Sequence, residues 1–352
     1  MNNPFSLSFG ILPEQFISRD EIKDEVFTDF GVFTKSQSNV CILTGVRGSG
    51  KTVMLNFLKN EFNKIEDWIV LNINPELDIL QEIAAKLYEY GALKKYFVKA
   101  TFNFSFQGIG FSIKGETPIT SVETLLEKMM KIIQSKQKKV LITIDEISNS
   151  QNVKIFSHTF KNMVNDRLPI YLLATGLNEN VYNLQNNETL TFIYRAKKIE
   201  IKSLNLMAIA KSYMDTLSLN EEIAMKCAAL TEGYASAYQV LGSILFKTKK
   251  KDIDDDVLFE FDKILEDINY SKLWEDLSSG DKKVLYGLSS QKNNRASDIV
   301  KNAKVTREVY TKYRERLIKR GIVESNSYGY LSLTLPRLYN FIQRMKYFDS
   351  VE

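Results

Sequence analysis

The sequence predicts an α/β fold in which helices cover a parallel five-stranded sheet, followed by a helical region and a small C-terminal domain. Three observations lead to this prediction. In the first 203 residues, five short apolar runs alternate with segments of helical periodicity, which is typical of a parallel sheet with helices on both faces. From residue 204 to about 270 the pattern is helical throughout. From residue 280 onward, three short helical patterns precede two extended segments that contain glycines.

The five apolar runs are the predicted strands. The first run is almost unbroken, as expected for a parallel strand that is buried on both faces. The intervening helices carry apolar residues at helical spacing. The strands are expected at Val40–Thr44, Trp68–Ile73, Val140–Glu146, Ile170–Gly176 and Lys198–Ser203, and helices at Glu21–Val32, Leu77–Tyr90 and Val122–Gln134.

A segment at about residues 100–115 interrupts this alternation. Phe102, Phe104 and Phe106 alternate with polar residues, and a Gly-Ile-Gly turn and a second short apolar run follow. This pattern predicts a β-hairpin inserted between two helices. Its aromatic side requires a cover. That cover is either the edge of the domain or a partner such as a neighbouring subunit or a nucleic acid.

The first strand leads into the pattern G-x-x-x-x-G-K-T, which we call the glycine loop (Gly45–Thr52), and a helical segment follows. In this context the glycines let consecutive backbone N–H groups surround a triphosphate at the positive end of the helix. Lys51 is expected to reach the β- and γ-phosphates, and the Thr52 hydroxyl to ligate Mg²⁺. The sequence therefore predicts binding of ATP with Mg²⁺. The expected nucleotide contacts are Gly45, Val46, Arg47, Gly48, Ser49, Gly50, Lys51, Thr52 and Val53.

Four further residues are candidates for the chemistry of ATP hydrolysis. Asp145, at the end of the third strand, is expected to hold the magnesium, and Glu146 to orient and deprotonate the attacking water. Thr175, at the end of the fourth strand, is expected to sense the γ-phosphate or to hold the water. Arg195, just before the fifth strand, is expected to stabilise transition-state charge at the γ-phosphate of a neighbouring subunit. That role requires at least transient homo-oligomers.

This order of motifs resembles the AAA+ ATPases, and more narrowly the bacterial and archaeal ATP-binding proteins allied to origin-recognition initiators. The resemblance includes the glycine loop, Asp145-Glu146, Thr175-Gly176-Leu177, Arg195 and the helical segment Thr231–Gly242. It implies a sheet order of 5-1-4-3-2 and a helical lid over the nucleotide. It also implies an adenine pocket formed partly by Ile17–Arg19, so that Arg19 is a further expected nucleotide contact. The predicted domains are the nucleotide-binding core at 1–203, the lid at 204–272 and a winged-helix domain at 273–352.

One part of the lid departs from this family. Lids of the initiator type carry a second sensor arginine after Gly-x-x, and the related signal-transduction ATPases place Gly-x-Pro there. This chain has Gly233-Tyr234-Ala235-Ser236, which is neither. The departure favours slow turnover and a switch controlled by the bound nucleotide.

The C-terminal segment is basic. Residues 271–352 hold 16 Lys and Arg against 9 Asp and Glu, whereas the whole chain has a net charge of only +4. Three helices followed by a two-stranded ribbon describe a winged helix, with Thr306–Arg320 as the helix that enters a DNA groove. Val309, Tyr313 and Leu317 are expected to pack inward. The expected contacts with double-stranded DNA are Arg307, Thr311, Lys312 and Arg314.

Composition limits the remaining possibilities. No apolar run approaches the length of a membrane span, Met1–Pro4 lacks the pattern of a signal peptide, and two cysteines suggest no disulfide framework. We therefore expect a cytoplasmic protein with no membrane partner. The single histidine, His158, belongs to no Cys/His cluster, so no metal other than Mg²⁺ is expected.

The function predicted from these features is an ATPase that couples its nucleotide state to self-assembly and DNA binding. The alternative is a slow ATP-dependent signalling or defence switch whose winged helix binds a protein. A helper ATPase of a mobile element has the same biochemical properties as the first.

Overall fold

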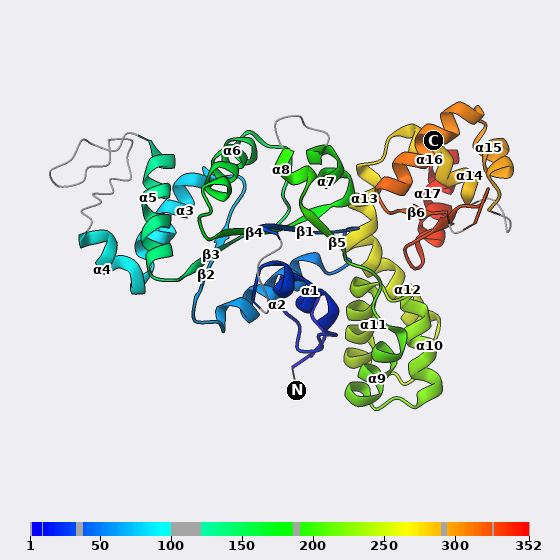
Figure 1. Cartoon of the computed structure of the whole chain (residues 1–352). Coiled ribbons are helices and arrows are strands. Elements are labelled where there is room, and N and C mark those ends of the chain that lie inside the picture. The colour runs from blue at the N-terminus through cyan, green and yellow to red at the C-terminus, as the bar shows by residue number, and fades with distance from the viewer. Residues whose placement is uncertain are drawn as a thin grey trace.

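The computed structural model describes residues 2–8, 10–32, 38–99, 121–185, 191–289, 294–325 and 327–351. The hairpin predicted at about 100–115 lies outside these described residues. Figure 1 shows the sheet with its helices, which we call the sheet domain. Beside the β5 edge lie a helical lid, below, and the C-terminal region (residues 278–351), above.

The sheet has five parallel strands in the order β2-β3-β4-β1-β5. Read from its other edge, this is the order 5-1-4-3-2 that the family resemblance implied, which is thereby confirmed. The fifth strand ends at Glu200, earlier than predicted. The N–H of Ile201 still donates to Thr44 of β1, and by Leu204 the backbone donates to Gly233 of the lid instead. The strands are β1 (Val40–Gly45), β2 (Trp68–Ile73), β3 (Lys139–Ile144), β4 (Ile170–Leu177) and β5 (Lys197–Glu200).

Helices cover both faces of the sheet. In β1, Val40 and Ile42 pack against one set of helices, and Cys41 and Leu43 pack against the other. All four side chains are buried, which explains the unbroken apolar run in the sequence. One face is covered by α3 (Ile79–Glu89), α4 (Gly91–Lys99), α5 (Val122–Ser135), α6 (Gln151–Asn165), α7 (Asn178–Gln185) and α8 (Thr191–Tyr194), and the other by α1 (Asp20–Asp29) and α2 (Lys51–Asn63).

The lid consists of four helices, and polar side chains fix where three of them begin. Asn205, Asn220 and Asp254 each accept hydrogen bonds from backbone N–H groups of the first turn. After the fourth helix the chain continues without a break through the π-helical turn η2 (Glu266–Tyr270) into α13 (Ser271–Glu275). The lid helices are α9 (Leu206–Leu217), α10 (Glu221–Thr231), α11 (Ala235–Thr248) and α12 (Asp255–Leu265).

The C-terminal region contains the three predicted helices and an antiparallel ribbon. A capping box of Ser278 and Asp281 begins the first helix, and Thr306 caps the third. A fourth helix, which the sequence did not predict, follows the ribbon. The elements are α14 (Ser279–Leu288), α15 (Ala296–Ala303), α16 (Arg307–Lys319), β6 (Val323–Glu324), β7 (Ser332–Leu333) and α17 (Leu338–Val351).

The face that α16 buries differs from the prediction at one position. Val309 was expected to pack inward, but it is 38% exposed, whereas Tyr310 is 4% exposed. Leu317 is buried as predicted, and Tyr313 lies against Gly280 of α14. Tyr310 and Leu317 are seven residues apart, which places them two turns apart on the same side of the helix. The buried stripe is therefore rotated by one residue.

One hydrophobic core runs through the lid and the C-terminal region, with Tyr270 and Trp274 among its members. The predicted boundary at 272/273 falls inside α13. The C-terminal region also contacts the sheet domain, because Arg320 Nε lies 2.7 Å from Glu179 Oε2 of α7.

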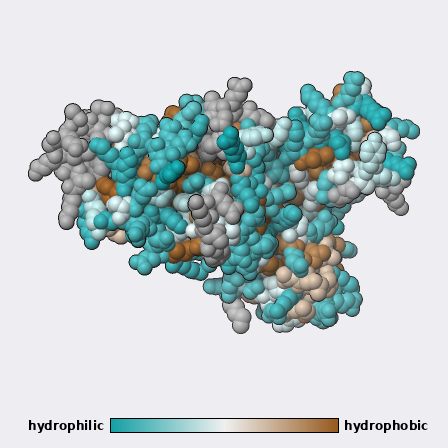
Figure 2. Space-filling view, in the orientation of Figure 1, coloured by the Kyte–Doolittle hydropathy of each residue, from teal (hydrophilic) through white to brown (hydrophobic). Residues whose placement is uncertain are grey.

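The face of the molecule in Figure 2 is mostly hydrophilic. Among the residues that the structure describes, no helix combines the length and apolar character needed to cross a bilayer.

Candidate functional site

The glycine loop follows β1 and leads into the first turn of α2. Gly48 and Gly50 have φ values of +76° and +94°, a left-handed conformation that a residue with a side chain rarely adopts. At Gly48 a side chain would also collide with the lid, because its Cβ would lie 2.0 Å from the Tyr234 hydroxyl. The backbone conformation therefore favours glycine at both positions, and the close approach of the lid requires it at Gly48.

Four consecutive carbonyl groups of the glycine loop accept hydrogen bonds from side chains or from the lid backbone. Lys51 Nζ donates to the carbonyl of residue 46 at 2.7 Å, and the Tyr234 hydroxyl donates to that of residue 47 at 2.6 Å. The Ser236 N–H donates to the carbonyl of residue 48 at 3.1 Å, and Arg19 Nη2 to that of residue 49 at 3.2 Å. Each peptide is planar and trans, so fixing a carbonyl also fixes the N–H on its opposite side. The loop thus presents an ordered series of N–H groups, as phosphate cradles do.

Lys51 is almost completely buried, with 8% of its surface exposed. Burial lowers the pKa of its ammonium group to about 8, although the nearby carboxylates of Glu146 and Asp145 favour the charged form. The phosphates of a bound nucleotide would add negative charge beside this ammonium group and so favour its charged form.

Asp145 is held between two hydroxyl groups. The Thr52 hydroxyl donates to Asp145 Oδ2 at 2.9 Å, and the buried Thr175 hydroxyl donates to Asp145 Oδ1. The backbone N–H of Glu146 donates to the Thr175 hydroxyl at 2.9 Å. The structure therefore brings Thr52, Asp145 and Thr175 together, and Thr175 is engaged with the two acids.

The pair of Thr52 and Asp145 suits Mg²⁺, which takes oxygen ligands and uses one or two protein groups together with substrate phosphates. Within the described ranges, the structure contains no cluster of three or more His, Cys, Asp or Glu residues that could hold a metal ion. A magnesium site that is completed by phosphates and water does not need such a cluster.

Arg19 is buried and joins three parts of the chain. Its Nη2 donates to the carbonyl of Ser49 in the glycine loop and, at 3.0 Å, to the carbonyl of Lys202 after β5. Burial lowers the pKa of its guanidinium group from the usual value. Arg19 lines the cavity described next, but its observed hydrogen bonds hold the backbone of the loop.

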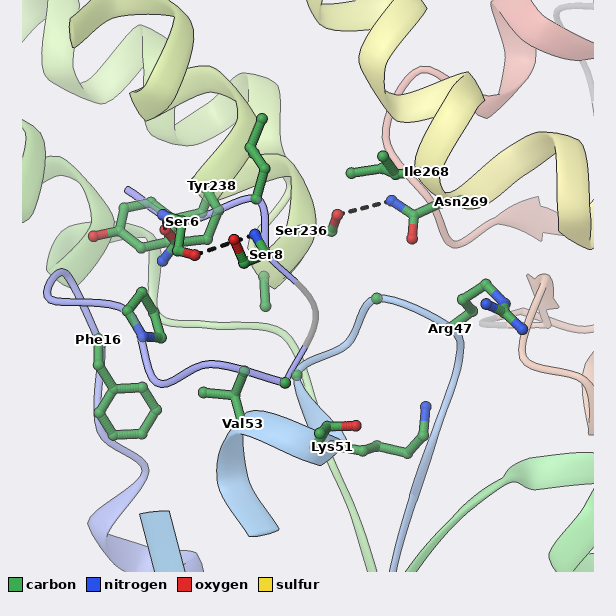
Figure 3. A pocket seen from close by; sticks show the side chains of 18 of the residues that line it. Ser6, Ser8, Phe16, Arg47, Lys51, Val53, Ser236, Tyr238, Ile268 and Asn269 are labelled. Atoms are coloured by element: carbon green, nitrogen blue, oxygen red, sulfur yellow. Dashed lines mark hydrogen bonds between the residues drawn. The ribbon is translucent and has the colours of Figure 1, made fainter. Parts of the chain in front are cut away.

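A cavity of about 410 Å³ lies above the glycine loop, within the size range of ligand pockets. Figure 3 shows Phe16 and Tyr238 at one end and the tips of Lys51 and Arg47 at the other. Val53 forms part of the floor, and the lid and η2 form the opposite wall. The cavity thus has an aromatic end and a cationic end. Its lining includes the loop residues Arg47, Gly48, Gly50, Lys51 and Thr52, together with Val53 of α2 and Glu146.

Several residues of this cavity were not predicted as site residues. Ser236 lines the cavity, and Tyr234 donates to the glycine loop beside it. Both follow Gly233, where the sequence departed from the related lids, so that departure was a usable signal. Phe16 and Tyr238 gave no signal, because isolated aromatic residues are most often part of a core. Asn269 of η2 also lines the cavity, and nothing in the sequence pattern marks a π-helical turn.

Arg195 is exposed and lies between α8 and β5. Lys197 pairs with Cys41 in the parallel ladder. Arg195 therefore lies at the N-terminal ends of the strands, whereas the glycine loop lies at their C-terminal ends. From the rise of a parallel strand, it is roughly 20 Å along the sheet from Gly45. Arg195 is therefore placed away from the cavity of its own chain.

The candidate DNA contacts lie on α16. Arg307, Thr311 and Lys312 are exposed, whereas Arg314 is half-buried. Glu308 and Glu315 are also exposed on this helix, so its outer surface carries both charges.

The order of the five parallel strands, with the glycine loop after β1, is the P-loop NTPase fold in the arrangement of AAA+ structures. Residues 32–175 match the KAP family P-loop domain, and residues 269–342 match a domain of unknown function (DUF8462). A search of curated proteins found no match to the chain.

Solved structures that are similar to the chain over nearly its whole length include the following two. A Walker-type ATPase of Pyrococcus abyssi superposes with a TM-score of 0.68 at 15% identity, covering 96% of this chain and 99% of that one. The ORC2 protein of Aeropyrum pernix, in ADPNP–ADP complexes, superposes with a TM-score of 0.60 at 10% identity, covering 98% of each chain. At these identities the likeness establishes the fold, and the predicted fold class is confirmed.

Proposed function

We propose that the chain binds ATP with Mg²⁺ in the 410 Å³ cavity and hydrolyses it slowly. The observation that carries the proposal is the arrangement of the cavity. Its cationic end combines the ordered N–H groups of the glycine loop with the Lys51 ammonium, which is suited to phosphates. Its aromatic end, formed by Phe16 and Tyr238, is suited to stacking on a base. The two ends of the cavity therefore match the two ends of a nucleotide, its phosphates and its base.

The acids after β3 have separate roles in this proposal. Thr52 and Asp145 hold Mg²⁺, which neutralises charge on the phosphates. Glu146 lines the cavity and accepts the proton of the attacking water. Thr175 positions both acids, since its hydroxyl donates to the carboxylate of Asp145 and accepts from the N–H of Glu146. Both carboxylates are near enough to Lys51 to favour its charged form.

Slow turnover is expected because the lid residues that line the cavity just after Tyr234 carry no positive charge. Ala235 and Ser236 line the cavity where the related initiators present an arginine. Arg195 is the group we propose for stabilising the transition state in a neighbouring subunit. Its exposed position before β5, away from the cavity of its own chain, supports this role. Full activity therefore requires self-assembly.

We further propose that the chain is divided into a nucleotide-binding core at 1–203, a lid at 204–272 and a winged helix at 273–352 that binds double-stranded DNA. The support is the order of α14, α15, α16 and the β6–β7 ribbon, together with the basic composition of this segment. Tyr328 is fully exposed at the turn of the ribbon and would form the tip of the proposed wing. Arg307, Thr311, Lys312 and Arg314 are the proposed contacts.

A second candidate function is a switch whose C-terminal region binds a protein. The specific observation in its favour is the outer surface of α16, where exposed Val309 lies between Arg307 and Lys312 and next to Glu308. An apolar residue among mixed charges suits a protein contact better than a phosphate backbone.

Two substitutions test the proposed ATPase. Glu146→Gln keeps the shape of the side chain but removes the base, so ATP binding should persist while hydrolysis falls by about 10²–10⁴-fold. Lys51→Ala removes the buried ammonium group and should weaken ATP binding itself. The measurements are equilibrium binding of radiolabelled ATP and release of phosphate in a single turnover. Hydrolysis at the parent rate by Glu146→Gln would show that another group is the base, and a parent protein that binds no ATP would refute the proposal.

A further inference from the structure

The π-helical turn η2 joins the lid to the C-terminal region at the wall of the cavity. Turns of this kind are rare, appear mostly as single turns within α-helices and are frequent at functional sites. Here the turn lies between α12 and α13 and places Ile268 and Asn269 in the lining of the cavity. Figure 3 shows both side chains on the wall opposite Val53, with Asn269 directed at Ser236 of the lid.

Asn269 is connected to the glycine loop through the lid. Its side chain is 4% exposed, and Nδ2 donates to the Ser236 hydroxyl at 2.7 Å. The backbone N–H of Ser236 in turn donates to the carbonyl of Gly48. Asn269 Oδ1 also lies directly over Gly48, since it would be 2.7 Å from a Cβ atom at that position. Two contacts therefore link this one side chain to the centre of the loop.

The next residue, Tyr270, is connected to the C-terminal region. Its hydroxyl donates to the carbonyl of Pro336, and its ring lies 5.9 Å from the ring of Phe341 in α17. At the start of the turn, Glu266 forms an ion pair with Arg344 of α17. One short turn thus contacts the glycine loop on one side and α17 on the other.

We propose that Asn269 is a positioning residue that holds the lid on the glycine loop and transmits the occupancy of the cavity to α17. The inference rests on the nucleotide binding proposed above. A nucleotide that binds the N–H groups around Gly48 pulls on peptides whose carbonyls the lid already holds, so Ser236 and Asn269 shift with them. Because Tyr270 is the neighbour of Asn269 in the same turn, that shift reaches α17. A coupling of this kind is a difference in binding free energy between two states and is reciprocal.

The chain carries its own reporter for this test. It has two tryptophans, Trp68 in β2 and Trp274 in α13. Trp274 is buried with its ring 5.5 Å from Tyr286 and 5.7 Å from Phe341, so its emission depends on the packing of α17. In the full-length chain, Trp68→Phe leaves Trp274 as the single reporter. Binding of radiolabelled ATP and ADP, with Mg²⁺, is measured in parallel with the emission of Trp274.

In the Trp68→Phe protein, the emission of Trp274 should change and should saturate together with nucleotide binding. With Asn269→Ala added, nucleotide should still bind, with an affinity on the order of tenfold lower, and the emission change should disappear. Ser236→Ala removes the same hydrogen bond from the lid side and should give the same result. It also keeps the test valid if Asn269→Ala does not fold. Asp267→Ala, at an exposed position of the same turn, is the matched control and should keep both signals.

Two outcomes would overturn the inference. One is an unchanged emission response in both Asn269→Ala and Ser236→Ala, which would show that the hydrogen bond transmits nothing. The other is a Trp68→Phe protein that binds nucleotide while Trp274 stays silent, which would show that α17 does not respond. Failure of the Trp68→Phe protein and of the parent to bind nucleotide is a separate result, because it refutes the proposed function and the inference with it.

Discussion

The buried ammonium group of Lys51 makes the affinity for ATP depend on pH. In the free protein its pKa is lowered to about 8 by burial, and the phosphates of a bound nucleotide favour the charged form. Above pH 8 the free protein loses this proton, and binding must restore it. The affinity should therefore fall by up to tenfold for each further pH unit.

The magnitude follows from the fraction of free protein that carries the charge. With a pKa of about 8, that fraction falls by about 25-fold between pH 7.5 and pH 9.5, which corresponds to about 1.9 kcal/mol of binding free energy. The phosphates do not titrate in this range, because their second pKa is about 6. Tyr238, which also lines the cavity, stays neutral because burial raises its pKa to about 12.

Unfolding linked to Lys51 does not explain such a loss of affinity. The folded-state pKa of Lys51 is below its usual value of 10.5, so between pH 8 and pH 10.5 the unfolded chain binds more protons than the folded one. Stability rises with pH wherever the unfolded state binds more protons. Titration of Lys51 therefore makes the free protein more stable over the range in which it weakens ATP binding.

The assay is equilibrium binding of radiolabelled ATP at constant Mg²⁺ and ionic strength from pH 7.5 to 9.5. Lys51→Arg is the matched control, because a guanidinium group stays charged throughout this range. Its affinity should be lower than that of the parent at pH 7.5 but nearly independent of pH. A flat profile in the parent protein, or an equal slope in Lys51→Arg, would refute the assignment of the titrating group.

Three further predictions concern other parts of the chain. Arg195→Ala should leave ATP binding unchanged but abolish the increase of ATPase rate with protein concentration, measured by phosphate release. Replacing Arg307 and Arg314 together by Glu should eliminate salt-sensitive binding of duplex DNA in a shift assay without altering ATP affinity; unaltered DNA binding would favour the protein-binding alternative. Arg316→Met should lower the free energy of unfolding in urea by about 2–4 kcal/mol, because the fully buried carboxylate of Asp281 keeps its hydrogen bonds to Ser278 but loses its ion-pair partner, which is itself 35% exposed.

Local patterns were sufficient to predict the sheet and the glycine loop. β2 has the predicted bounds, and β1, β3 and β4 differ from the predicted strands by at most two residues at either end. An apolar run buried on both faces, followed by glycines and a helix, is a signal contained within about twenty residues. The phosphate-binding backbone is made by that same stretch. Sequence reasoning was therefore most accurate where the chemistry and the pattern that reports it are adjacent.

The face of α16 shows where a local pattern is not enough. Val309 and Tyr310 are neighbouring apolar residues, and either can begin a stripe that continues through Tyr313 and Leu317. Helical periodicity does not distinguish the two, because each stripe falls within the width of one helix face. The packing of α14 decides, since Tyr313 contacts Gly280 and Tyr310 is buried while Val309 is not. The packing of α14 against α16 thus decides which of two apolar stripes is buried, the one that begins at Val309 or the one that begins at Tyr310.

The lid contacts were beyond prediction for a different reason. Tyr234 and Arg47 are 187 residues apart in the chain, and the hydrogen bond between them uses a backbone carbonyl that has no residue-specific signature. Ser236 likewise reaches the loop through its own backbone N–H. A contact between a backbone group and a distant segment leaves almost no trace in the identity of either residue, so a single sequence cannot reveal it.

These contacts also limit what a phosphate-binding motif can predict. Of the four carbonyls that shape the glycine loop, Lys51 holds one from within, Arg19 of the N-terminal segment holds another, and Tyr234 and Ser236 of the lid hold the remaining two. The geometry of the N–H groups therefore depends on where the lid and the N-terminal segment lie. A motif in the loop predicts that phosphates can bind, but the rate of turnover and the response to ATP or ADP depend on the segments that hold its carbonyls. Asn269, which holds one of those segments in place, is for that reason a better position than the motif itself for altering the switch while preserving the site.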